Sequence, residues 1–318
     1  MMRLHRHPTN HDVQWTPSSR AGFGLMALAA LLVQAMTVRA DLTHLYTFND
    51  GMATDLVGNA DGAFVGNASV SGGKLILPGG GLGITGDHLS LLSDGADGIN
   101  IAGYSNATFE LWATAADTDT WARYFDFGGK SLSGPGAAGN SIFLTVHALE
   151  NGSMRATISN VNINTQTGNL NEDEASASPA AVPLTGPGGV LGVERHVVVT
   201  FNGSANQMLL YYEGNLAAQN LNTDNMLELL QESYALLGAS LYNNDRNFNG
   251  SINEFRIYNH VLSASAVMGN YITGPTVEVP EPSSALALMS GAMCLFWWRK
   301  QHSSKQQVVL RRGAGCAE

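Results

Sequence analysis

Cysteine is almost missing from this chain of 318 residues. The only two, Cys294 and Cys316, lie near the C-terminus, so residues 41 to 275 contain none. Their absence excludes a disulfide framework, a thiol nucleophile and a thiolate metal site from the central region. A core that needs no covalent staple is expected instead, because a domain of this length buries a large fraction of its surface.

Positive charge is also scarce in the central region. Between Asp41 and Glu281 there are 24 Asp and Glu residues and only seven Lys and Arg, a net charge of −17, whereas both ends of the chain are basic. Nucleic-acid binding depends on neutralising phosphates with Lys and Arg. The composition therefore argues against nucleic acid as a partner. An acidic domain is compatible with binding of calcium or soluble glycans, or its charge serves only to keep the protein soluble.

The N-terminus has the three parts of a secretory signal. Arg3, Arg6 and Arg20 precede the apolar stretch AGFGLMALAALLVQAM, and the sequence VRA then ends at Ala40. A basic lead, a short apolar core and small residues one and three positions before the cut define such a signal. We therefore expect residues 1–40 to form a signal helix that is removed by cleavage after Ala40.

The C-terminus carries a second targeting pattern. A proline-containing box precedes the apolar stretch ALALMSGAMCLFWW, which ends in a basic Arg-Lys pair. The box consists of Val279, Pro280, Glu281 and Pro282. Proline resists the helical conformation, so the box stays extended, and the basic pair is expected on the cytoplasmic side of the membrane. This order resembles the PEP-CTERM sorting signal, which implies an exosortase-type sorting enzyme as a partner in a Gram-negative-type bacterium.

The two ends divide the chain into five predicted parts. They are a signal peptide (1–40), a folded domain (41–275), a PEP-containing linker (276–284), a transmembrane sorting helix (285–298) and a basic cytoplasmic tail (299–318). The protein is expected to be exported. It is then either anchored in the cell-envelope membrane through the C-terminal helix or extracellular after processing.

The central region is predicted to be all-β. Its short apolar runs alternate with polar residues and are bounded by turn-forming residues, which is typical of strands. The predicted strands are THLYTF, KLIL, TFELWAT, RYFDFG, SIFLTVHAL, SMRATISN, RHVVVTFN, QMLLYYEG, SYALLGASL and NEFRIY. Two segments are predicted to be helical, MLELLQ capped by Asp224 and LSASAVMGNYI capped by Ser263 or by the preceding turn. Residues 162–192 are predicted to be a long loop. Many short strands with Gly-rich turns indicate a sandwich or jelly roll.

Several of these segments resemble the laminin G-like, concanavalin A-like family. The opening LYTFNDGMATDLVGNADG, the strand TFELWAT with Trp112, and the closing LLGASLYNNDRNFNGSINEFRIYNHVLS carry the resemblance. It covers most of residues 43–270 and implies a jelly-roll sandwich of two antiparallel sheets. Independently of the family, INEFRIY indicates a bulge or a change of facing near Glu254, because its apolar residues do not keep one alternation.

One structural calcium ion is the only cofactor that the residues suggest. Asp55, Asn59 and Asp61 lie in the tight turn DLVGNAD and offer carboxylate and amide oxygens, the ligands that calcium prefers. Glu254 resembles the closing-motif acid that lies near this turn in the family. The alternative is that the turn residues are ordinary Asx-turn residues.

A glycan-binding loop is the second prediction. The segment YNNDRNFNG combines aromatic rings with amide and carboxylate groups, which is the chemistry of sugar recognition. The predicted contacts are Tyr242, Asn243, Asn244, Asp245, Asn247 and Phe248. A solvated hairpin loop is the alternative.

Catalytic motifs are missing. The paired-acid strand pattern of concanavalin A-like glycoside hydrolases does not occur, and neither do G-x-S-x-G, H-E-x-x-H or a phosphate-binding loop. We therefore predict that the protein is not an enzyme but a recognition module with carbohydrate as its partner. A structural, self-associating surface or exopolysaccharide-associated protein and a cryptic glycoside hydrolase are the alternatives.

Overall fold

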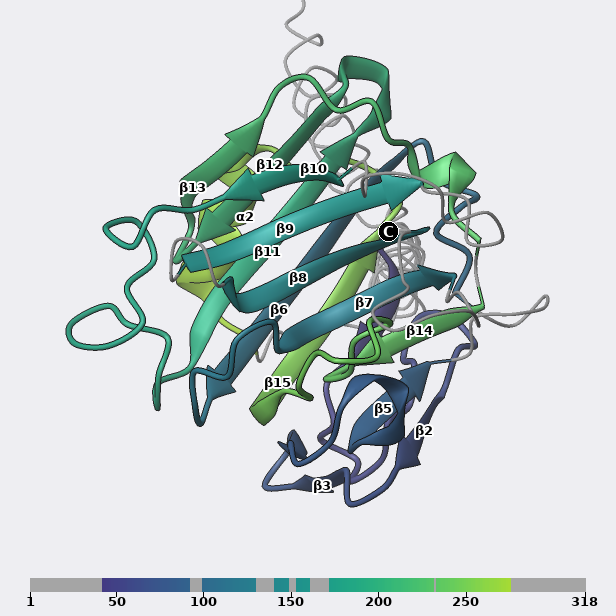
Figure 1. Cartoon of the computed structure of the whole chain (residues 1–318), viewed down its shortest axis with the longest axis vertical. Coiled ribbons are helices and arrows are strands. Elements are labelled where there is room, and N and C mark those ends of the chain that lie inside the picture. Colours follow the sequence, from purple (N-terminus) through teal and green to yellow (C-terminus); the bar gives the residue numbers. More distant parts are fainter. Residues whose placement is uncertain are drawn as a thin grey trace, which may run out of the picture. The chain divides into compact units, whose positions relative to one another are not determined.

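The computed structural model describes residues 42–91, 99–129, 140–148, 153–160, 172–231 and 233–275. These residues form two antiparallel sheets packed as a jelly-roll sandwich, so the predicted fold class is confirmed (Figure 1). The signal peptide with its cleavage site at Ala40 and the sorting segment after residue 275 lie outside the described residues. Among the described helices, none is long and apolar enough to cross a membrane.

One sheet has eight strands in the order β13-β12-β11-β6-β15-β4-β3, with β1 paired to β15. Its strands are β1 (Leu42–Tyr46), β3 (Ser69–Ser71), β4 (Lys74–Pro78), β6 (Asn106–Ala115), β11 (Arg195–Asn202), β12 (Gln207–Tyr212), β13 (Asn215–Asn220) and β15 (Asn249–Tyr258). The pairing of β6 with both β11 and β15 places strands that are distant in sequence side by side.

The other sheet has seven strands in the order β10-β9-β8-β7-β14-β5-β2. Its strands are β2 (Gly62–Val65), β5 (His88–Leu91), β7 (Arg123–Gly129), β8 (Asn140–Ala148), β9 (Ser153–Asn160), β10 (Glu172–Ser176) and β14 (Tyr234–Leu237). Short 3-10 turns are η1 (Gly83–Thr85), η2 (Gly203–Ala205) and η3 (Leu227–Leu229), and the helix α2 spans Ala264–Thr273.

The core lies between the sheets because alternate residues of each strand point inward. Phe109 on β6 stacks on Phe125 of β7 with 4.8 Å between ring centroids, and Phe127 lies 5.7 Å away. All three rings are buried. Stacked aromatic pairs contribute about 0.5–1.5 kcal/mol beyond the area that they bury. The opposite residues of the same strands point away from the core, and on the seven-stranded sheet they form the candidate site.

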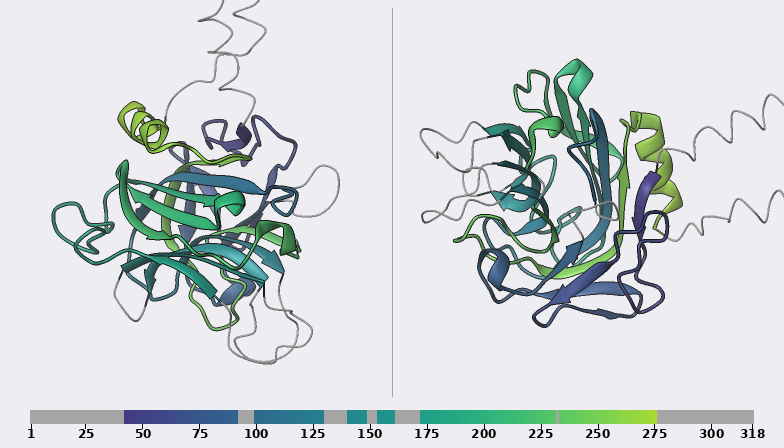
Figure 2. Two further views of the ribbon diagram at one scale, coloured as in Figure 1. Left: turned by 90° about the horizontal axis from the view of Figure 1, so that it is seen from above. Right: turned by 90° about the vertical axis from the view of Figure 1, so that its right-hand side faces the viewer.

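Helix α2 packs on the outer face of the eight-stranded sheet (Figure 2). The Ser263 hydroxyl accepts a hydrogen bond from the Ala266 N–H at 3.2 Å, so the predicted cap is confirmed. Val267 packs against Val198 and Tyr258 of the sheet. The last described element before the sorting segment is therefore fastened to the sandwich.

Two local predictions were wrong. Glu172–Ser176, inside the predicted long loop, is strand β10 at the edge of the seven-stranded sheet. The segment MLELLQ is only the 3-10 turn η3, which starts after Met226 without a side-chain cap. Asp224 instead donates its backbone N–H to Asp173, because the chain here turns back across the sheet edge.

Candidate functional site

The outer face of the seven-stranded sheet carries an unusual set of buried polar side chains. Cross-strand pairing puts Asp126 of β7 opposite Phe143 of β8, Phe143 opposite Thr157 of β9, and Thr157 opposite Glu174 of β10. Their sequence neighbours belong to the core, so these residues point outward. Figure 1 shows the four strands side by side in front of the other sheet.

Arg123 lies at the centre of this face. Its guanidinium carbon is 3.3 Å from the ring centroid of Phe143 and 5.1 Å from that of Tyr242. Nη2 donates to Asp245 at 2.8 Å, and Nε lies 3.4 Å from Asp126. We call Arg123, Asp126, Phe143, Tyr242 and Asp245 the Arg123 cluster. It combines aromatic rings with charge-assisted hydrogen bonds.

A loop after β14 completes the cluster. Leu241 donates its N–H to Asp126 at 2.9 Å, and the hydroxyl of Tyr242 donates to Glu172 on β10 at 2.7 Å. The ring of Tyr242 meets Phe143 edge to face at 6.1 Å. The loop therefore folds back over the sheet and spans it from β14 to β10.

Burial has the largest effect on the pKa of Asp126 in the Arg123 cluster. Desolvation raises the pKa of Asp126 to about 6, although Arg123 opposes the shift. Arg123 Nη1 is buried and has no hydrogen-bond partner within the described part of the chain. Such a donor is costly to leave unpaired.

The predicted glycan loop divides into three groups. Tyr242 and Asp245 join Arg123, as described, and Asn243 and Asn244 lie at the loop tip, where Asn244 is exposed. Asn247 is buried and donates to the backbone oxygen of Asp87. Phe248 is buried with its ring 4.9 Å from Tyr124, so this ring is not available for stacking on a sugar.

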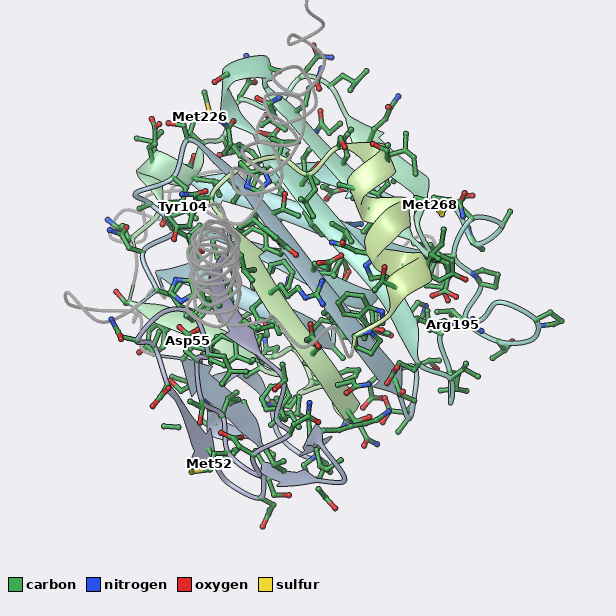
Figure 3. The ribbon with its side chains drawn as sticks, turned by 180° about the vertical axis from the view of Figure 1, so that it is seen from behind. Met52, Asp55, Tyr104, Arg195, Met226 and Met268 are labelled. Carbon is green, nitrogen blue, oxygen red and sulfur yellow. The ribbon has the colours of Figure 1, made fainter. Side chains whose placement is uncertain are left out.

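The predicted calcium turn is organised by Asp55 (Figure 3). Its Oδ1 accepts backbone N–H groups of Leu45, Val57 and Gly58, and its Oδ2 accepts from His44 at 2.7 Å and from Ala60 at 3.1 Å. Burial acts to raise the pKa of Asp55, but these hydrogen bonds outweigh it and lower the pKa. Both carboxylate oxygens of Asp55 thus accept hydrogen bonds from N–H donors.

The other predicted ligands are more dispersed. Asp61 Oδ1 accepts the backbone N–H of Asp55 at 2.8 Å, and Asn59 is exposed. Glu254 forms its ion pair with Arg256. No three His, Cys, Asp or Glu side chains of the described ranges converge to hold a metal ion. Calcium binding by this turn stays a prediction.

Glu254 instead lies beside a polar cluster beneath α2. The cluster is centred on Glu110, which is fully buried on β6 and accepts hydrogen bonds from four side chains. The donors are His196 (2.8 Å), Arg256 (3.1 Å), Tyr258 (2.8 Å) and Asn270 (3.0 Å). We call these five residues the Glu110 cluster. Glu254 pairs with Arg256 at 2.5 Å, and the register of β15 shifts between Ile252 and Glu254, so the predicted bulge is confirmed.

The two carboxyl groups around Arg256 differ in their pKa. Burial raises the pKa of Glu254 to about 7, because the charge of Arg256 compensates only partly. Burial acts in the same direction on Glu110, but its hydrogen bond from His196 and the charge of Arg256 lower the pKa below its usual value. Since α2 covers these groups, they serve to hold the helix rather than to bind a ligand.

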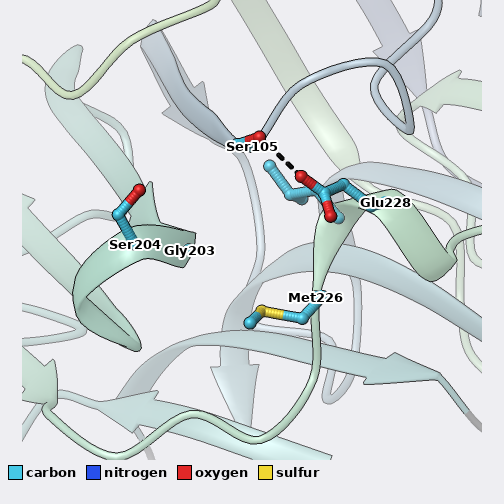
Figure 4. A pocket seen from close by; sticks show the side chains of 6 residues that line it. Ser105, Gly203, Ser204, Met226 and Glu228 are labelled. Atoms are coloured by element: carbon cyan, nitrogen blue, oxygen red, sulfur yellow. Dashed lines mark hydrogen bonds between the residues drawn. The ribbon is translucent and has the colours of Figure 1, made fainter.

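A pocket of about 200 Å³ lies at the rim of the sandwich (Figure 4). Its lining comes from the start of β6, from η2 and from η3. The residues are Ser105, Gly203, Ser204, Met226, Leu227 and Glu228. Ser105 donates to Glu228 at 2.5 Å. The pocket is small and partly polar.

Sequence reasoning missed most of the outer face, including Trp121, Arg123, Arg155 and Glu174. A signal was present, since Arg123 and Arg155 each stand within a strand whose neighbours are apolar. A charged residue inside a buried strand requires a partner. Its partners come from segments distant in sequence, and no local pattern identifies them.

The chain resembles known proteins in both sequence and fold. Residues 86–268 match the Concanavalin A-like lectin/glucanases superfamily, and residues 278–300 match the PEP-CTERM protein-sorting motif. A comparison with curated proteins gives no match.

Three solved structures share the fold. Domain 4 of an extracellular GH43 arabinanase from Geobacillus stearothermophilus, in complex with arabinotriose, is 18% identical, with a TM-score of 0.50 over 72% of this chain and 97% of that one. The binding domain of botulinum neurotoxin serotype D/C is 15% identical, with a TM-score of 0.52 over 74% of this chain and 52% of that one. Botulinum neurotoxin type C, whose cell entry depends on interaction with two ganglioside molecules, is 13% identical, with a TM-score of 0.52 over 75% and 52%.

The present chain spans about half the length of the two toxin structures. At these identities the similarity shows the fold alone. The superfamily match, however, covers more than half of the chain. The protein therefore belongs to the concanavalin A-like lectin/glucanases superfamily and carries a PEP-CTERM sorting motif.

Proposed function

We propose that the protein is an exported, non-catalytic carbohydrate-binding protein whose ligand lies on the outer face of the seven-stranded sheet. The observation that carries this proposal is the Arg123 cluster, in which a guanidinium with an unpartnered Nη1 is held between aromatic rings and carboxylates. The sorting motif implies export and envelope sorting, with an exosortase-type enzyme acting on the segment after residue 275.

The chemistry of the face supports a sugar ligand. Tyr242 is only half-buried, and an aromatic ring is the kind of surface that stacks on an apolar sugar face. Arg123, Asp245 and Glu172 supply donors and acceptors for hydroxyl groups. Two proteins with this fold bind carbohydrate, namely the arabinanase domain with arabinotriose and the type C toxin with gangliosides.

A binding role is better supported than hydrolysis. Asp126 and Asp245 both bind the guanidinium of Arg123, so neither is free to act as a nucleophile. A glycoside hydrolase needs one carboxyl group as acid and another as base or nucleophile on either side of the bond. Two acids that share one arginine do not meet this requirement.

The test is a glycan panel probed with the exported full chain, purified in detergent. We expect saturable binding of at least one soluble polysaccharide, and Tyr242→Ala is expected to weaken it about 30-fold, the effect of removing a central aromatic contact. The matched control is Phe64→Ala, which removes an exposed aromatic ring from β2, three strands away from β7 in the same sheet. Its binding should equal that of the unchanged chain.

Two results would contradict the proposal. The first is the absence of detectable binding to any glycan of the panel, which would favour the structural, self-associating role. The second is product release from any bound glycan, which would favour a hydrolase. Circular dichroism of each variant confirms that a loss of binding does not reflect unfolding.

A further inference from the structure

An exposed apolar surface lies at the C-terminal end of helix α2. Ile272 is 75% exposed, Leu216 is 50% exposed and Tyr271 is 37% exposed, although each has a large apolar side chain. Leu216 on β13 pairs with Tyr211, which packs in the apolar cluster beneath α2, so Leu216 faces the same side of the sheet as the helix. We call Leu216, Met268, Tyr271 and Ile272 the α2 patch.

The patch is continuous because the helix meets the turn between β12 and β13. Met268, Tyr271 and Ile272 are three and four residues apart and lie on one side of α2, where Figure 3 labels Met268. A Cβ atom on Gly214, in that turn, would lie 2.9 Å from the sulfur of Met268 and 3.1 Å from the ring of Tyr271. Leu216 follows this glycine by two residues. The helix and the turn therefore form one surface.

Charge is missing from the helix that carries the patch. Between Ala264 and Thr273 α2 has no Asp, Glu, Lys or Arg, although the central region of the chain has a net charge of −17. The adjoining turn carries Glu213, but Arg195 neutralises it in an ion pair at 3.1 Å. Anionic lipid headgroups repel an acidic surface. They do not repel this one.

The place of the patch in the chain favours a membrane as its partner. Only nine residues, 276–284, separate the last described residue from the apolar stretch 285–298. Nine residues span at most about 32 Å when fully extended. If the apolar stretch enters the membrane as the sequence predicts, this tether keeps α2 near the bilayer. At an effective concentration on the order of mM, even a weak affinity for lipid is sufficient.

A second copy of the chain fits the patch less well. Its three exposed side chains offer roughly a few hundred Å², whereas each partner in a stable interface contributes about 800 Å². A bilayer needs no complementary protein surface. The small area is thus compatible with a tethered contact to lipid and too small for a stable dimer.

We propose that the α2 patch is a lipid-contacting surface, which rests the sandwich on the phospholipid bilayer that holds the sorting segment. Tyrosine is enriched at membrane–water interfaces, because its ring is apolar and its hydroxyl stays hydrated. Isoleucine and leucine side chains enter the boundary between headgroups and acyl chains. The contact turns the outer face of the eight-stranded sheet toward the membrane and leaves the seven-stranded sheet facing away from it. It does not depend on carbohydrate binding.

The test uses the full chain in vesicles of phosphatidylethanolamine and phosphatidylglycerol that contain a spin-labelled lipid as a fluorescence quencher. Cys294 and Cys316, the only cysteines of the chain, are first replaced by serine. A fluorescent label is then attached to Ile272→Cys. The matched control is Leu229→Cys, an exposed apolar position on η3 whose carbonyl accepts a hydrogen bond from Asn140 of the seven-stranded sheet. The label at residue 272 should lose most of its emission, and the label at residue 229 almost none.

A second variant tests the patch itself. Leu216→Glu, in the chain labelled at residue 272, should restore the emission, because it adds a charge to the patch and leaves the buried core unchanged. Its matched control is Leu221→Glu, which changes a leucine of similar exposure beyond the other end of β13 and should leave the quenching as it was.

Three results would overturn the inference. They are equal quenching at residues 272 and 229, no quenching at either position, and quenching at residue 272 that persists in Leu216→Glu. Protection of the label at residue 272 from aqueous iodide only at a high ratio of protein to lipid, without quenching by the lipid, would assign the patch to a second copy instead. The glycan panel is a separate measurement, so either proposal can fail while the other stands.

Discussion

Replacing Glu110 by alanine is expected to release helix α2 from the eight-stranded sheet. Glu110 is fully buried and is the shared acceptor for His196, Arg256, Tyr258 and Asn270. Three of these donors lie on strands, and Asn270 lies on α2. The substitution therefore leaves a buried guanidinium without one of its carboxylates and removes the polar link between sheet and helix.

The magnitude follows from the burial of the pair. Removing one partner of a buried ion pair costs about 3–5 kcal/mol, because the other charge stays desolvated. For a domain of this size each kcal/mol lowers the melting temperature by about 2–4 °C, so Glu110→Ala should lower it by about 6–20 °C. Glu254 also pairs with Arg256, which places the expected value in the lower half of this range.

Thermal unfolding followed by circular dichroism measures this shift. The matched control is Glu228→Gln, since Glu228 is exposed and makes a single hydrogen bond to Ser105. We expect the control to change the melting temperature by less than about 2 °C, as surface substitutions usually do. A shift this small for Glu110→Ala would refute the role of the Glu110 cluster. Limited proteolysis should in addition cut α2 in this variant first.

Three further predictions concern pH, the Asp55 turn and calcium. Because the pKa of Glu254 is raised from 4.5 to about 7, the folded state binds more protons than the unfolded state between these values. The free energy of unfolding, measured in urea, should therefore fall as the pH rises from 4.5 to about 7, and Glu254→Gln should flatten this slope. Asp55→Asn should lower the free energy of unfolding by about 2–3 kcal/mol, because the amide NH₂ of the new asparagine would face the N–H donors of His44 and Ala60. An unchanged urea midpoint would contradict this. Since Asp55 is occupied by these donors, we expect calcium to leave the melting temperature unchanged, whereas a saturable rise, lost with chelator, would support the predicted calcium site.

The sequence was sufficient for the architecture because strands carry local signals. Alternation located ten of the fifteen strands that the described residues form, the irregular spacing in INEFRIY located the bulge at Glu254, and Ser263 marked the start of α2. Strand β10 was not predicted because its charged residues, including Glu172 and Glu174, are more typical of a loop. They are tolerated in a strand because it is an edge strand whose outward side chains pair with other residues of that face.

The candidate site was harder to predict because it is assembled from distant segments. Arg123 and Asp245 are 122 residues apart in the chain, and Tyr242 and Glu172 are 70 apart. The loop residues Tyr242 and Asp245 were predicted from their chemistry alone. Their partners depend on how the loop after β14 folds back over the sheet, which no local pattern in the sequence encodes.

The most direct test of the account is hydrogen exchange of the exported full chain with and without the polysaccharide that it binds. If the ligand lies on the outer face of the seven-stranded sheet, protection should appear in β8 to β10 and in residues 239–248, and the rim pocket at Ser105 and Glu228 should exchange as before. Protection confined to that pocket would contradict the proposed site and would move the ligand to the rim of the sandwich.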